Sequence, residues 1–122
     1  MTLTPPLLVF LAGAFVVVFL LGFRLTRSGR PYSGLVLTIH KLVALAALVI
    51  LALLVGRAAR TAPLDAVVWV ASLAGAVIFV VAIISGGLLS TDKALPPVVK
   101  ALHRVSPFLA ALASAATLYF LP

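Results

Sequence analysis

The sequence contains no cysteine and only two acidic residues, Asp65 and Asp92, among its 122 positions. Without cysteine the chain has no disulfide bond, no thiolate zinc site, no cysteine nucleophile and no cysteine-ligated iron–sulfur cluster. With only two carboxylates, paired-carboxylate hydrolysis and calcium or magnesium cages are also excluded. Most enzyme chemistry is thereby removed, and we expect a protein that is not a stand-alone enzyme.

Charge of either sign is scarce, because 9% of the residues are charged and 65% are hydrophobic. Soluble domains contain about 25% charged and about 45–50% apolar residues, so we expect the partner of most of this surface to be the lipid bilayer. The net charge of +7 comes from Lys and Arg in short segments between apolar runs. That placement indicates a topology signal, and no nucleic-acid partner is expected.

Four apolar segments have the length needed to cross a bilayer, about 20 residues. Charged residues, prolines and glycines set their limits at 5–23, 34–55, 64–86 and 97–121. The first segment is expected to be a retained span, since no basic residue precedes it and no small-x-small cleavage site follows it. With short connections, the sequence predicts an all-α fold in which 1–122 is one integral membrane domain, a four-helix bundle with up-down-up-down order.

The sequence makes one prediction for the start of the third segment and one for its end. Asp65 is suited to the positive end of the helix dipole, and Ser85, Gly86 and Gly87 are expected to end the helix. Further along the chain, Pro107 is expected to kink the fourth helix or to free a backbone carbonyl.

Basic residues are divided unevenly between the two sides of this bundle. Two, Arg57 and Arg60, lie on one side, and the other seven are Arg24, Arg27, Arg30, Lys41, Lys93, Lys100 and Arg104. The positive-inside rule makes the richer side cytoplasmic and places both termini outside. We therefore expect a prokaryotic-type inner (cytoplasmic) membrane protein, with Trp69, Tyr119 and Tyr32 as interfacial anchors.

The two halves of the chain align without a gap at an offset of 63 residues. The matched pairs are His40 with His103, Lys41 with Arg104, Arg30 with Lys93, Leu25 with Leu88 and Ala47 with Ala110. This pattern predicts an internal repeat of two parallel helical hairpins, each with a histidine about two turns into its second helix.

His40 and His103 are the only histidines in the chain. Ionisable residues at membrane depth are costly and usually functional. The second and fourth helices of such a bundle lie across its diagonal, so the two imidazoles are expected to face each other at similar depth. A b-type haem, with its iron ligated by both histidines, fits between them.

Residues around the histidines fit the same hypothesis, because small side chains leave volume and cations pair with haem propionates. The expected pocket wall is Ala44, Ala47, Pro107, Ala110 and Ser114, and the expected propionate partners are Lys41, Arg104, Lys100 and Arg30. Thr38, or a carbonyl one turn earlier, is expected to accept the second ring N–H of His40.

With Thr38-Ile39-His40-Lys41 and Ala101-Leu102-His103-Arg104 so placed, the chain resembles the small four-helix membrane b-type cytochromes. Many of those proteins carry four histidines and two stacked haems, whereas this sequence provides ligands for one haem. The resemblance implies an electron-transfer or haem-dependent redox subunit, with a quinone or a second redox subunit as partner.

Other interpretations stay open. Interfacial histidines and small-residue packing, as at Ala71-x-x-x-Gly75, need no cofactor and suit a haem-free accessory or structural subunit of a larger membrane complex. A small transporter is suggested by the repeat and by Pro107, but no acidic residue lies at mid-depth. A transition metal would be under-ligated by two imidazoles. Histidines that face outward would bind haem only between protomers of a homo-oligomer.

Overall fold

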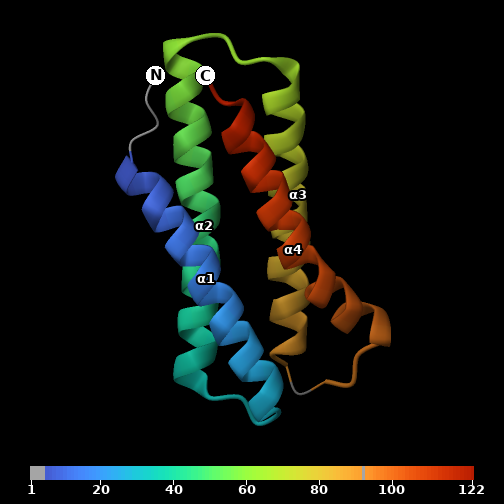
Figure 1. The fold of residues 1–122 in the computed structure, drawn as a ribbon. Coiled ribbons are helices and arrows are strands. Elements are labelled where there is room, and N and C mark those ends of the chain that lie inside the picture. Colours follow the sequence, from blue (N-terminus) through green and yellow to red (C-terminus); the bar gives the residue numbers. More distant parts are fainter. Residues whose placement is uncertain (1–4, 92) are drawn as a thin grey trace. The chain divides into compact units, whose positions relative to one another are not determined.

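The computed structural model describes residues 5–91 and 93–122, and within them the regular secondary structure consists of four α-helices (Figure 1). They are α1 (Pro5–Ser28), α2 (Gly34–Thr61), α3 (Ala66–Leu89) and α4 (Pro97–Phe120). The predicted all-α class and the four predicted helices are confirmed. Asp92 lies outside the described residues.

Three of these helices, α1, α2 and α3, are long and apolar enough to cross a membrane. Large apolar side chains such as Phe10, Leu73 and Val77 lie exposed on their surfaces, as lipid-facing residues do. The helix α4 is as long as α1 but is not in this group, because its first turns carry Lys100, His103 and Arg104. The prediction of a membrane protein is supported, and the fourth span stays a prediction.

The chain divides into two compact units, residues 1–56 and 57–122. The first unit contains α1 and most of α2, and the second contains α3 and α4. In each unit two successive helices form a hairpin (Figure 1). Each unit therefore carries one of the two histidines, His40 or His103, on its second helix.

Helix ends depart from the limits that charged residues and glycines suggested. The helix α1 continues through Arg24 to Ser28, and α2 continues through Gly56 to Thr61. Arginine is a good helix former, and its long side chain reaches from an apolar helix toward water. An arginine therefore does not end the helix.

The start of α3 lies where the sequence placed it. Asp65 is the N-cap residue, and its carbonyl accepts hydrogen bonds from the N–H groups of Val68 (3.0 Å) and Trp69 (3.3 Å). Its side chain makes no cap hydrogen bond. The predicted position of this residue at the helix dipole is confirmed.

The predicted end of α3 is wrong, because the helix passes through Ser85, Gly86 and Gly87 and continues to Leu89. The stop is instead provided by Ser90, whose N–H donates to the Gly86 carbonyl (3.1 Å) and whose Oγ donates to the Gly87 carbonyl (2.7 Å). The glycine at position 86 serves helix packing, since the side chain of His103 occupies the space that a Cβ would take.

Small residues bring α3 and α4 close together, as the Ala71-x-x-x-Gly75 pattern suggested. A Cβ added at Gly75 would lie 3.3 Å from the Cβ of Ala113 on α4. The buried face of α4 has helical spacing and consists of Ser106, Ala110, Ser114 and Thr117. The helix stays continuous through Pro107, one turn after His103.

Candidate functional site

His40 in the first unit is held against α1. The residue lies six positions after the first residue of α2, and its side chain is half-buried. Its Nδ1 is 3.1 Å from the carbonyl oxygen of Val18, and its Cε1 is 3.1 Å from the position of a Cβ at Gly22. A carbonyl only accepts hydrogen bonds, so Nδ1 carries the proton and the lone pair of the neutral ring is on Nε2.

His103 in the second unit is held against α3 in the same manner. It also lies six positions after the first residue of its helix. Its Nδ1 is 3.0 Å from the carbonyl oxygen of Ala82 and 3.3 Å from Oγ of Ser85. A Cβ at Gly86 would lie only 2.6 Å from its Cε1. Here too the proton is on Nδ1 and the lone pair is on Nε2.

Each histidine thus has a cradle on the preceding helix, made of a carbonyl and a glycine one turn later. The cradle of His40 is Val18 and Gly22, and that of His103 is Ala82 and Gly86. The imidazole lies directly on the helix backbone at both positions, so a Cβ at Gly86 (2.6 Å from the ring) would force a shift, and a Cβ at Gly22 (3.1 Å) would make a tight contact.

Sequence reasoning found the histidines but missed both cradles. The sequence does contain a glycine at nearly the same distance before each histidine: Gly22 precedes His40 by 18 residues, and Gly86 precedes His103 by 17 residues. The two glycines therefore match at an offset of 64, one more than the offset that aligns the histidines, and an ungapped comparison passes over them.

The acceptor of the ring N–H also differs from the expectation. Thr38 is exposed, and the carbonyl that His40 reaches belongs to α1 and not to its own helix. The physical reason is that carbonyls inside α2 are already bonded to N–H groups one turn later, whereas the ring extends toward the neighbouring helix. In both units the ring packs onto the other helix of its own hairpin.

The five predicted wall residues lie on the same helix faces as the histidines. Ala47 and Ala110 have 1% of their surface exposed, Ser114 has 2%, and Ala44 and Pro107 are half-buried. The Ser114 hydroxyl is used within its own helix, since it donates to the carbonyl of Ala110 (2.7 Å). Their role as walls of a cofactor pocket stays a prediction.

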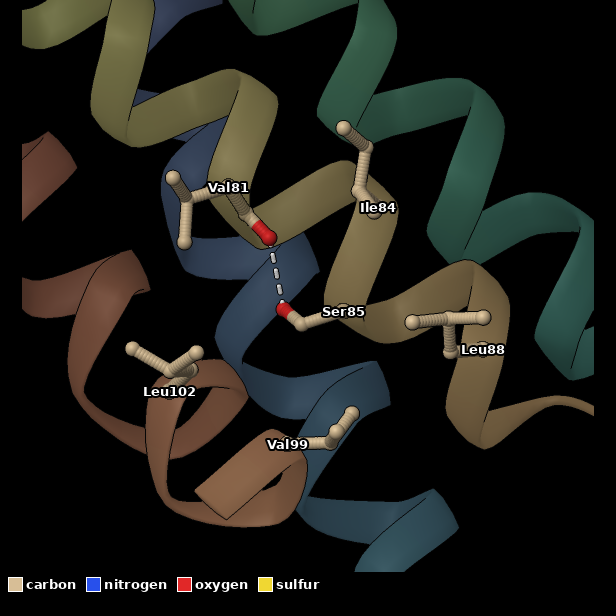
Figure 2. Close-up of a pocket in the computed structure, with 6 residues that line it drawn as sticks. All are labelled: Val81, Ile84, Ser85, Leu88, Val99 and Leu102. Carbon is tan, nitrogen blue, oxygen red and sulfur yellow. Dashed lines mark hydrogen bonds between the residues drawn. The ribbon is translucent and has the colours of Figure 1, made fainter. Parts of the chain in front are cut away.

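A groove lies between α3 and α4 (Figure 2). Its volume is about 240 Å³, and its lining residues are Val81, Ile84, Ser85, Leu88, Val99 and Leu102. Of these, Ser85 contacts His103, and the other five are aliphatic. None of the predicted wall residues lines this groove.

The predicted propionate partners are exposed at the ends of the two hairpins. They are Lys41, Lys100, Arg104 and Arg30. The guanidinium carbon of Arg30 lies 5.9 Å from the centre of the Tyr32 ring, a cation–π contact. Exposed cations one residue after each histidine are well placed to attract anionic groups.

Within the described ranges, 5–91 and 93–122, no three His, Cys, Asp or Glu side chains gather to hold a metal ion. Each unit offers one imidazole, that of His40 or of His103, as a nitrogen donor.

Among the buried hydroxyl groups of α3 and α4, Ser106 is different. Ser85, Ser114 and Thr117 donate to carbonyls of their own helices at 2.7–2.8 Å. Ser106 has 4% of its surface exposed, and its Oγ has no hydrogen-bond partner among the described residues. A buried hydroxyl of this kind is normally satisfied by a bound group or by water.

Comparison with known proteins gives no relative, since no protein family, curated protein or solved structure matches this chain. The function is therefore inferred from the residues of the chain itself.

Proposed function

We propose that this protein is an integral membrane b-type cytochrome that holds one haem between α2 and α4, with His40 and His103 as its axial ligands. In this role it is an electron-transfer or haem-dependent redox subunit. The observation that carries the proposal is the shared setting of the histidines, each of which donates its Nδ1–H to a carbonyl of the neighbouring helix. Ligating histidines are oriented in this way, with the tautomer fixed and the lone pair on the other nitrogen.

Other features of the chain support the same function. The glycine cradles fix the plane of each imidazole, which an axial ligand requires, and Ser106 has a buried hydroxyl available one turn after His103. When bound, haem supplies a one-electron couple whose potential is set by its axial ligands and surroundings. The chain holds the rings, surrounds them with apolar helices and supplies exposed cations for the propionates.

The proposal includes an up-down-up-down bundle in which α4 also crosses the membrane. The polar start of α4 then lies at the cytoplasmic surface, where Lys100 and Arg104 reach the headgroups. The two hairpins are repeats of one unit, supported by the equivalent positions of Gly22 and Gly86 beside their histidines.

The electron partner that suits this arrangement is a quinone in the bilayer or a second redox subunit. A haem ligated near the start of α2 and α4 lies in the cytoplasmic half of the membrane. Transfer across the full membrane then needs a further centre on a partner, since the chain has no histidine toward the outer side.

Absorption spectra of the purified protein test this function. We expect protein expressed with haem supply and purified in mild detergent to be red, with the sharp reduced bands of six-coordinate low-spin haem b and one haem per chain. The measurement is the reduced-minus-oxidised spectrum together with a pyridine haemochrome assay of haem per protein.

A colourless protein that also fails to take up added haem would sink the cytochrome proposal. Co-purification of that colourless protein with a larger membrane complex would instead favour the accessory subunit. Stabilisation against heat by a particular solute would favour the transporter.

The proposed sidedness has its own test, because the natural chain is free of cysteine. Ser28 and Thr61 are matched positions, each the exposed last residue of its helix. We expect Thr61→Cys to react with a membrane-impermeant maleimide in intact cells and Ser28→Cys to react only after permeabilisation, as the positive-inside rule requires. The reverse labelling pattern would show that the basic loops face outward.

A further inference from the structure

We propose that the groove between α3 and α4 holds an acyl chain of one anionic phospholipid, whose headgroup pairs with basic residues at the loop end of this hairpin. The site goes beyond the proposed function and needs no haem. It belongs to the second unit alone, residues 57–122, which contains the groove and both of its helices.

The groove lies in the helical turns next to the loop that joins α3 and α4. Its residues on α3 are spaced along one helix face from Val81 to Leu88, and Leu88 is the last residue but one of α3. Those on α4, Val99 and Leu102, lie in its first two turns. Seven residues of helix extend about 10 Å. The groove is therefore elongated along α3, as a hydrocarbon chain parallel to the helix requires.

A difference in helix spacing explains why this space stays open. Farther from the loop α3 and α4 are in close contact, since a Cβ at Gly75 would lie 3.3 Å from the Cβ of Ala113. Nearer the loop the imidazole of His103 lies on the backbone of Gly86, so a ring separates the two helices there. The first turns of α4 also diverge from the end of α3 in Figure 1.

The lining of the groove suits hydrocarbon and does not suit water. A bound water needs two to four polar partners, and Ser85 is the one polar residue among the six described residues of the lining. Its Oγ already donates to the Val81 carbonyl at 2.7 Å, as Figure 2 shows. The volume of about 240 Å³ is far more than the roughly 10–15 Å³ that one water needs. Because Ile84, Leu88 and Leu102 are exposed, a chain can enter the groove from the side.

The charge at this end of the hairpin favours an anionic headgroup. Lys93, Lys100 and Arg104 are exposed there, whereas α3, α4 and the connection between them contain a single acidic residue, Asp92. Basic side chains at the end of an apolar helix reach the headgroup layer, where each adds to the binding of anionic lipid. A phospholipid with net negative charge therefore matches both parts of the site, the apolar groove and the cations at its loop end.

Native mass spectrometry of the whole chain in mild detergent tests the groove. With phosphatidylglycerol and phosphatidylcholine of the same acyl chains added in equal amounts, we expect one phosphatidylglycerol to be retained per chain. Leu102→Trp fills the groove and should abolish this retention. The control Leu112→Trp places the same ring at an exposed position of α4 outside the groove and should leave retention unchanged. Equal retention by these two variants overturns the site.

The fold and the headgroup are checked with further variants. Leu102→Ala leaves the groove open and should still retain the lipid, which separates filling of the groove from loss of the fold. Lys100→Gln should lower the preference for phosphatidylglycerol about fivefold, the contribution of one basic residue near an anionic surface. Arg60→Gln removes an exposed cation near the opposite end of α3 and should leave the preference unchanged. Equal retention of the two lipids by the natural chain overturns the anionic site.

A photochemical cross-link identifies the occupant in the membrane. The natural chain is free of cysteine, so Leu102→Cys provides a single thiol for a benzophenone label. On irradiation in membranes we expect the mass of one phospholipid to be added to the intact chain. A doubled chain mass would show that a second copy occupies the groove, and a cross-link to residues 5–56 would show that the other hairpin does. Either of these results overturns the lipid site.

Discussion

Replacing Gly86 by alanine should lower the thermal unfolding midpoint of the protein in mild detergent by several degrees. The added Cβ would lie 2.6 Å from Cε1 of His103, closer than non-bonded carbons can approach. The ring is held there by the Ala82 carbonyl, so moving it breaks that hydrogen bond, and moving the helix opens the interface between α3 and α4. Overpacking of this kind costs about 1–3 kcal/mol of the free energy of unfolding.

The adjacent glycine provides the matched control. Gly87 lies in the same helix, and a Cβ added there would have nothing within 4 Å. Since alanine favours a helix over glycine by about 0.5–1 kcal/mol, Gly87→Ala should leave the midpoint unchanged or raise it. Gly22→Ala should fall between the two, because its Cβ would lie 3.1 Å from the His40 ring. Equal midpoints for Gly86→Ala and Gly87→Ala would contradict the close contact with His103.

The number of helices and their approximate positions were predictable from the sequence. A bilayer admits helices of about 20 apolar residues, so long runs without charge define their number and approximate places. The ends were less predictable, because arginines and glycines can lie inside a helix when its terminal turns are near water. Gly86 looked like a helix stop and is a packing position, a distinction that depends on what lies across the interface.

The candidate histidines could be identified from the sequence, whereas the geometry around them could not. The chain contains only two histidines and no cysteine, so the candidate ligands are identified by composition. Each histidine lies six residues after the first residue of its helix, and the sequence predicts this equal spacing. The carbonyls of Val18 and Ala82 are backbone atoms, and any residue at those positions supplies one. These carbonyls can accept the ring N–H because a glycine one turn later lets the imidazole approach the helix backbone. That effect of the glycines depends on the neighbouring helix, so it cannot be seen in the sequence alone.

Replacing either histidine by alanine should abolish the six-coordinate haem spectrum and lower haem affinity by at least about 100-fold, which exceeds the usual effect of outer partners of a ligand. The chain offers no substitute, since it contains no cysteine, no third histidine and a single methionine, Met1. The variant with both histidines replaced should bind no haem. Thr38→Ala is the control, because this exposed residue close to His40 in sequence should leave the spectrum unchanged.

Two further measurements separate loss of a ligand from loss of the fold. In His103→Ala the space above Gly86 is vacated, so added imidazole should enter it and restore the six-coordinate spectrum, whereas a misfolded protein should not respond. Haem stoichiometry then decides between one chain and two. If His40→Ala stays six-coordinate with one haem per two chains, the iron is held by His103 of two copies, and the haem between α2 and α4 of a single chain is excluded.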